Sequence, residues 1–186
     1  MLISPVIHRW IPESGTGLEH LVVHCHDDAI VAQGVAIGDD EGERFGASYT
    51  IECDAAWHVR HAVVDVAGGA HLELFSDGRG HWHDGAGAPL DALAGCIDVD
   101  LTASCFTNTL PLRRFANVLE RRQAIDVAWI AVPELSVVRA AQAYTRLDSG
   151  LMLFEGVDID IDFRAELTVD ADGFIQRYPG LFRHLP

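Results

Sequence analysis

Strict alternation of apolar and polar residues is the feature that most constrains how this chain can fold. Residues 157–169 carry an apolar side chain at every second position, with charged residues or threonine between them. A period of two places each set on one face of a β-strand. Turn sequences such as DGRG (77–80) and DADG (170–173) separate the alternating runs. Short strands with a turn about every 8 to 12 residues predict a mostly antiparallel β protein.

One segment favours a helix. Residues 111–123 begin with a proline suited to an early helical position and then place apolar side chains on one face, at Leu112, Phe115, Val118 and Leu119. Residues 135–147 remain open between helix and strand, because alanines favour the first and valines the second. A single helix among many strands predicts a mainly β (α+β) fold, with a curved sheet packed on that helix. We see no linker and no repeat, so residues 1–186 are expected to form one domain.

Composition excludes several classes of partner. The 186 residues are 49% hydrophobic, enough for a large core, and carry a formal charge of −15 with no lysine. An acidic surface repels phosphate, so nucleic acid is not expected as a partner. No apolar run reaches the length of a transmembrane segment, and the start of the chain lacks the apolar stretch of a signal peptide. We therefore expect a cytoplasmic protein.

The cysteines form no recognisable motif. Cys25, Cys53, Cys96 and Cys105 contain no C-x-x-C pair, which excludes a zinc ribbon and a thioredoxin-type site. Disulfides would be expected in a secreted protein, whereas a cytoplasmic one keeps its thiols reduced and uses most of them as small core residues.

The stretch from Leu93 to Phe115 concentrates polar chemistry. Asp98 and Asp100 alternate with apolar neighbours and share one strand face. Asn108 follows in a polar turn, and Arg113 and Arg114 lie in the predicted helix. Taken alone, the acid pair fits a solvated strand face best.

Six motifs occur in order along nearly the whole chain: WIPESGTGLEH, YTIECDAAWHVR, DGRGHW, LAGCIDVDL, FTNTLPLRR and DGFIQRYPGLFR. Together they resemble the bacterial glycolipid-binding protein family, formerly a domain of unknown function. The pair CIDVDL and FTNTLPLRR is the most specific part of the resemblance. The resemblance implies a large antiparallel sheet wrapped around a single helix, remotely like the lipoprotein-localisation factors. It also implies a homodimer and an acidic pocket that binds a glycolipid or a lipid-like small molecule.

Candidate ligand-binding residues follow from that resemblance. Asp98 and Asp100 fit the acidic pocket best, because carboxylates accept hydrogen bonds from sugar hydroxyls. Tryptophans offer an apolar face to a sugar ring or acyl chain, although a core position is favoured for each of them. The arginines could balance the buried acids, bind a head group or lie on a solvated face. Asn108 fits a helix cap or a turn better than a ligand contact. The full set of candidates is Glu19, His20, Trp57, Arg60, Trp82, Asp98, Asp100, Asn108, Arg113 and Arg114, with Trp10 as a further aromatic candidate.

Three kinds of function stay open: a binding module, a hydrolase acting on a sugar-containing substrate, and a structural domain. Carboxylates two residues apart on a strand have Cα atoms about 6.6 Å apart, which is compatible with glycosidic acid–base chemistry. No G-x-S-x-G motif or phosphate-binding loop supports another enzyme class. The pairs His24–His26 and His81–His83 could each chelate zinc but lack a third ligand, so we expect neither metal nor cofactor.

Overall fold

The computed structural model describes residues 4–40, 42–157 and 163–186. Within these ranges, fourteen strands form one sheet with the order β7-β6-β5-β4-β3-β2-β1-β14-β13-β12-β11-β10-β9-β8. The first seven strands are β1 (Val6–Pro12), β2 (Gly17–Cys25), β3 (Ala29–Asp40), β4 (Glu43–Asp54), β5 (Val59–Val66), β6 (His71–Ser76) and β7 (Trp82–Asp84). The other seven are β8 (Asp98–Leu101), β9 (Gln123–Ile130), β10 (Val137–Asp148), β11 (Leu151–Gly156), β12 (Phe163–Val169), β13 (Ile175–Tyr178) and β14 (Phe182–Leu185).

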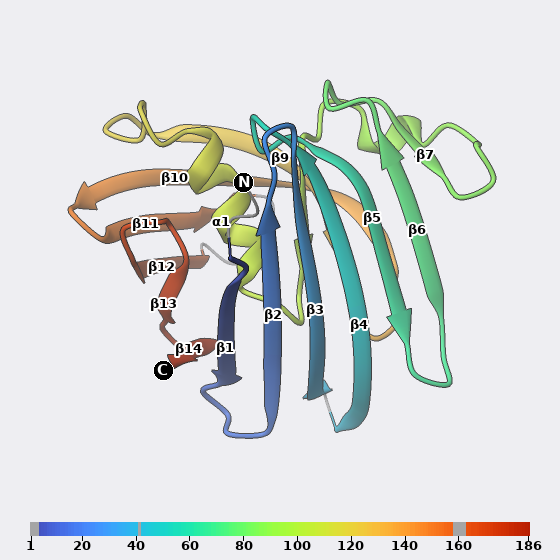
Figure 1. Cartoon of the computed structure of the whole chain (residues 1–186), viewed down its shortest axis with the longest axis horizontal. Helices are drawn as coiled ribbons and strands as arrows, with labels where there is room; N and C mark the ends of the chain where they lie inside the picture. Colours follow the sequence, from blue (N-terminus) through green and yellow to red (C-terminus); the bar gives the residue numbers. More distant parts are fainter. Residues whose placement is uncertain (1–3, 41, 158–162) are drawn as a thin grey trace.

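The sheet is antiparallel and strongly curved, as the alternation and the family resemblance predicted. Figure 1 shows β2 to β5 standing upright while β10 to β12 run nearly across them, with the α-helix between the two groups. One pair departs from the prediction, because β8 runs parallel to β9. A parallel pair needs a long connection. Here that connection, residues 102–122, contains the α-helix, whose first four residues, Thr109 to Leu112, are buried in the interior of the curve.

The two halves of the sheet join through the first and last strands. β1 pairs with β14, so that Arg9 lies opposite Leu185 and Pro12 opposite Phe182. β1 also pairs with β2, which continues the sheet on its other side. This β1–β14 seam holds together two groups of strands that are each contiguous in sequence.

The opposite edges of the sheet also approach each other. The segment before β8 touches the turn between β6 and β7, where the amide of Gly95 donates to the carbonyl of Gly80 at 3.0 Å. A Cβ atom on Gly80 would lie 2.7 Å from the Cα of Gly95, so only glycine permits this contact. The amide of Val59 donates to the carbonyl of Ile97 at 3.3 Å nearby. The curved sheet therefore almost encloses its core.

The helix is much shorter than predicted. The α-helix α1 spans only Thr109–Arg114, preceded by the 3-10 helix η2 (Phe106–Asn108); a second 3-10 turn, η1 (Asp91–Leu93), precedes β8. Residues 115–122 form turns instead of continuing the helix. The carbonyl of Leu119 accepts a hydrogen bond from the amide of Arg146 in β10 at 2.7 Å. The backbone thus bonds to the sheet at a position where an apolar periodicity of 3.6 predicted helix.

Most predicted strands are present. In β4, Tyr49, Ile51 and Cys53 are buried on one face, as predicted. The segment left open between helix and strand is strand β10. Of the alternating run 157–169, Phe163–Val169 forms β12, and the acidic ladder of Asp158, Asp160 and Asp162 lies outside the described residues. All four cysteines are free thiols, and three of them are buried.

Candidate functional site

The segment from β8 to α1 turns its polar side chains inward. Asp98, Ser104, Thr107, Asn108 and Thr109 are all buried. Buried polar groups need hydrogen-bonding partners, because leaving one unpaired costs free energy. The turn after β8 supplies some of these partners locally: the amide of Phe106 donates to Ser104 Oγ at 3.1 Å, and the amide of Leu101 donates to Thr107 Oγ1 at 3.3 Å.

Asp98 forms a closed ion pair. Its side chain is fully buried, and its Oδ2 accepts a hydrogen bond from the guanidinium of Arg114 in α1. Burial raises the pKa of Asp98, and the positive charge of Arg114 opposes that rise. The sequence predicted that both acids would line one pocket with an arginine in reach. The arginine is in reach, but Asp98 is sealed beneath it and does not line the cavity described next.

Asp100 belongs to a network of neutral polar groups. Its Oδ1 accepts from Thr107 Oγ1 at 2.9 Å, and its Oδ2 accepts from Gln142 Nε2 at 2.6 Å. The Tyr144 hydroxyl lies 2.8 Å from Asn108 Oδ1 and 3.2 Å from Gln142 Oε1. Burial raises the pKa of Asp100, and in the described part of the chain no arginine pairs with it. The network therefore holds an acid without a counter-ion.

Asp100 opens onto a cavity of about 380 Å³, here called the Asp100 cavity. One wall is polar and includes Asn108 and Gln142, whereas aromatic and aliphatic side chains form the rest. The cavity is lined by Asp100, Leu101, Thr102, Ser104, Asn108, Trp129, Ala140, Ala141, Gln142, Phe154, Gly156, Phe163, Tyr178, Leu181 and Phe182. Its volume falls in the usual range of small-molecule sites.

Glu19 is a second buried acid in the concave interior. Its Oε1 accepts hydrogen bonds from the Tyr49 hydroxyl and from Ser104 Oγ, both at 2.5 Å. Tyr49 reaches it by crossing over Gly34 in β3, where an added Cβ would lie 2.1 Å from the tyrosine ring. Burial raises the pKa of Glu19 to about 7, although the two hydroxyl donors partly offset the effect.

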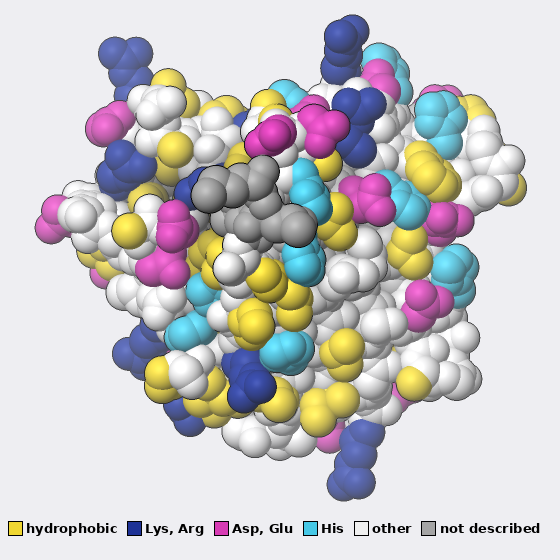
Figure 2. All heavy atoms as spheres, viewed as in Figure 1, with side chains coloured by type: hydrophobic (Ala, Val, Ile, Leu, Met, Phe, Trp, Pro, Cys, Tyr) yellow, Lys and Arg dark blue, Asp and Glu magenta, His cyan; other side chains and the backbone are white. Residues whose placement is uncertain are grey.

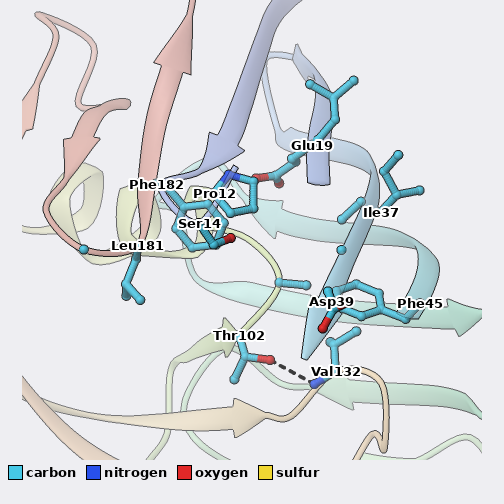
Figure 3. Close-up of a pocket in the computed structure, with 15 residues that line it drawn as sticks. Pro12, Ser14, Glu19, Ile37, Asp39, Phe45, Thr102, Val132, Leu181 and Phe182 are labelled. Carbon is cyan, nitrogen blue, oxygen red and sulfur yellow. Dashed lines mark hydrogen bonds between the residues drawn. The ribbon is translucent and has the colours of Figure 1, made fainter. Parts of the chain in front are cut away.

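Glu19 lines a second cavity of about 220 Å³, here called the Glu19 cavity. Figure 3 shows it between Glu19 and Ile37 on one side and Leu181 and Phe182 on the other. Thr102, Leu181 and Phe182 line both cavities, so the two cavities lie next to each other. The remaining lining residues of the Glu19 cavity are Pro12, Ser14, Leu18, Ala36, Gly38, Asp39, Phe45, Ala103, Val132 and Gly180.

The structure brings together only part of the predicted set. Asp100 and Asn108 line the Asp100 cavity, Glu19 lines the neighbouring one, and Asp98 and Arg114 pair beside them. Asn108 stands at the N-cap of α1 but makes no side-chain cap hydrogen bond. Its carbonyl oxygen accepts from Tyr144 instead, so its side chain serves the cavity wall.

The other candidates lie elsewhere. Trp82 and Trp10 are both buried in the core. The indole of Trp82 donates to the carbonyl of Cys96 at 2.8 Å. Trp57 is also buried, beneath the guanidinium of Arg113 at 5.1 Å from the ring centroid. The remaining two, Arg60 and His20, bond to the carbonyl of Ser76 and to the side chain of Arg9 respectively. None of these candidates lines either cavity.

Several lining residues escaped the sequence analysis. Trp129 lies beside Asp100 because β8 pairs in parallel with β9, which an antiparallel prediction could not give. Gln142 lies in the segment whose secondary structure was left open. Its inward position follows from strand alternation, so assigning residues 137–148 to a strand would have placed it on the face shared with Tyr144.

The histidine pairs do not gather further ligands. The rings of His24 and His26 stack with centroids 6.3 Å apart. Among residues 4–40, 42–157 and 163–186, no three His, Cys, Asp or Glu side chains form a group that could hold a metal ion. In the same ranges, no helix has the length and hydropathy needed to cross a membrane.

Comparisons with known proteins agree with this architecture. The family model described as "Putative glycolipid-binding" matches residues 7–184. A crystal structure of a DUF1089 family protein from Pseudomonas aeruginosa is similar to the chain with a TM-score of 0.79 and 39% sequence identity, covering 91% of this chain and 92% of that one. A comparison with curated proteins finds no match. The similarity therefore extends over nearly all of the sheet.

Proposed function

Because this chain belongs to the glycolipid-binding family, we propose that its Asp100 cavity binds the sugar head group of a glycolipid or of a related lipid. The observation that carries the proposal is the Asp100 carboxylate, which faces an aromatic-walled cavity without a cationic partner among the described residues. A carboxylate in such a place accepts hydrogen bonds from neutral hydroxyl groups, and a sugar carries several of them.

The two walls of the cavity fit the two chemistries of a glycolipid. Gln142 and Asn108 add amide groups beside Asp100 on the polar wall. Trp129 and Tyr178 also line the cavity, and the apolar C–H face of a sugar or the first carbons of a lipid chain can pack against aromatic rings. This division between a few convergent polar groups and an apolar remainder is typical of ligand sites.

A hydrolase built on the acid pair has less support. Glycosidic chemistry needs two carboxyl groups that both reach the substrate. Asp98 is fully buried and ion-paired with Arg114, so only Asp100 of the pair lines the cavity. We therefore propose binding rather than hydrolysis.

The test is to incubate the protein with a bacterial lipid extract, isolate it, and identify retained lipids by native mass spectrometry. The Asp100→Asn variant keeps the shape of the side chain and removes its charge. Hydrogen bonds to charged groups contribute about 1.5–3 kcal/mol, so we expect Asp100→Asn to weaken binding of the retained lipid at least about tenfold. Asp65→Asn, on an exposed acid that pairs with His71, is the matched control and should bind like the unchanged protein.

Two results would contradict the proposal. The first is an unchanged protein that retains no sugar-containing lipid. The second is an Asp100→Asn variant that retains the same lipid with the same affinity while Ala140→Leu, which fills the cavity, also has no effect.

A further inference from the structure

The Asp100 carboxylate has hydrogen-bonding capacity that the protein does not use. Asp100 lines the Asp100 cavity and remains partly exposed. Each of its oxygens accepts one printed-length hydrogen bond, 2.9 Å from Thr107 Oγ1 and 2.6 Å from Gln142 Nε2. An ionised carboxylate has about four acceptor positions, so about two of them stay available to a ligand.

The amide side chains of the same cavity add further acceptor capacity. The Tyr144 hydroxyl lies within hydrogen-bonding distance of two carbonyl oxygens, Asn108 Oδ1 and Gln142 Oε1, and both amide residues line the cavity. A hydroxyl group has one proton, so it donates to only one of these oxygens at a time. The polar wall is therefore rich in acceptors.

No positive charge in the cavity balances Asp100. Its two donors are neutral groups, and the lining residues include no arginine, lysine or histidine. The guanidinium of Arg114 pairs with Asp98 instead. Burial raises the pKa of Asp100, which reflects the free-energy cost of its charged form in this place. A cation bound beside Asp100 recovers part of that cost, whereas an anion is repelled.

Aromatic side chains form much of the remaining lining. Phe154, Phe163 and Tyr178 pack on one another with ring centroids between 5.8 and 6.2 Å apart. Trp129 is partly exposed and occupies the position of β9 that pairs with Asp100 of β8. The face of an aromatic ring attracts cations, and tryptophan does so most strongly. A carboxylate and an indole are thus neighbours on the wall of one cavity.

We propose that the head group bound in the Asp100 cavity bears a free ammonium group, as an unacetylated amino sugar does, and that this group binds beside Asp100 and Trp129. An ammonium group has three N–H donors and no acceptor, which suits an acceptor-rich wall better than a hydroxyl group, since a hydroxyl also accepts. The inference rests on the proposed function and adds the chemical class of the head group.

The experiment is an NMR titration at pH 7 with three probes that differ at one position of the sugar: hexyl glucoside, hexyl glucosaminide and the N-acetyl form of the glucosaminide. The indole N–H of Trp129 and the methyl groups of Leu101 report on the cavity. Hydrogen bonds to charged groups are the stronger kind, so we expect the glucosaminide to bind at least about tenfold more tightly than the other two probes.

Matched variants test the two groups that recognise the cation. Asp100→Asn keeps the shape of the side chain and removes its charge, so the three glycosides should then bind with similar affinity. Trp129→Leu keeps an apolar side chain and removes the ring, and it should reduce the preference for the glucosaminide about two- to fivefold. Asp65→Asn removes an exposed charge elsewhere and should keep the full preference.

A fourth probe, hexylammonium, separates this inference from the proposed function, because it has the cation and no sugar. Binding of hexylammonium without binding of any glycoside would support the ammonium site and overturn the sugar head group of the proposed function. Binding of hexyl glucoside at least as tight as that of the glucosaminide would overturn the inference and leave the proposed function standing. A preference that persists in Asp100→Asn would also overturn the inference, and the absence of shifts at Trp129 with all four probes would overturn both.

Discussion

At the scale of single residues, we expect substitution in the buried ion pair between Asp98 and Arg114 to lower the stability of the protein strongly. Replacing Arg114 by methionine leaves the buried Asp98 charge unpaired, which typically costs about 3–5 kcal/mol of unfolding free energy. We expect that loss in urea unfolding at pH 7. The double variant Asp98→Asn with Arg114→Met should regain part of it, because no charge then remains buried.

The exposed pair of Arg177 and Glu13 provides the control for this prediction. Arg177→Met should lower the unfolding free energy far less than Arg114→Met, since water already solvates both partners. Equal losses in the two variants would show that burial of the Asp98 pair has no special effect.

Glu19 makes stability depend on pH. Its pKa is about 7 in the folded protein, compared with 4.5 for an ordinary glutamate, so the folded state retains a proton that the unfolded chain releases. Stability from this group is therefore greatest below about pH 4.5 and declines as pH rises toward 7, by at most about 3 kcal/mol. Glu19→Gln should match the unchanged protein at pH 4 and exceed it by about 1–3 kcal/mol at pH 8.

Urea unfolding at the two pH values checks this expectation, with Glu166→Gln on the exposed face of β12 as the control. The expectation would be ruled out if the gain in unfolding free energy of Glu19→Gln over the unchanged protein were no larger at pH 8 than at pH 4.

At the scale of elements, alternation was enough to predict most strands because burial on one face enforces a period of two. The sequence pattern predicted the wrong structure where the backbone hydrogen-bonds to residues that are distant in sequence. Helix α1 ends at Arg114 although apolar spacing continues, because Leu119 bonds to β10. Pairing direction is also a long-range property, so the parallel β8–β9 pair and the place of Trp129 could not be predicted locally.

The residues of the candidate site also differ in whether local sequence could predict them. Asp100 and Asn108, which line the Asp100 cavity, were candidates because they are close in sequence and belong to a specific motif. The tryptophan candidates carried two interpretations, ligand site or core, with the core favoured; Trp82 is buried in the core. Strand alternation could have placed Gln142 on the inner face, but its hydrogen bond to Asp100 depends on where β10 lies relative to β8.

The absence of a side chain at Gly34 in β3 leaves room for the Tyr49 ring, which hydrogen-bonds to Glu19. Gly34→Ala would put a methyl group into the Tyr49 ring, so Tyr49 must move away from Glu19. We expect a loss of about 2–4 kcal/mol, as for overpacking combined with a broken buried hydrogen bond. In Gly46→Ala, on the neighbouring strand, the new Cβ would make only an ordinary contact 3.7 Å from Ile37 Cγ2. Thermal unfolding should show a marked decrease for the first variant only; similar melting temperatures would contradict this explanation.

At the scale of the whole molecule, we predict a homodimer, on the family resemblance and on the outer face of the sheet. Figure 2 shows hydrophobic side chains gathered over β1 and its neighbours, and Ile7, Val35 and Ile37 are each more than half exposed. Light scattering across a concentration series should give twice the chain mass, and Val35→Glu with Ile37→Glu should shift it toward the monomer. A monomer mass at all concentrations would refute the prediction.

The β1–β14 seam has a consequence for synthesis in the cell. β1 (Val6–Pro12) leaves the ribosome long before β14 (Phe182–Leu185), the strand that covers its edge. The amides and carbonyls on that edge of β1 stay unpaired until β14 has been synthesised, and such an edge can pair with other chains. The edge of β1 is therefore covered only when β14 has been synthesised and docks between β1 and β13.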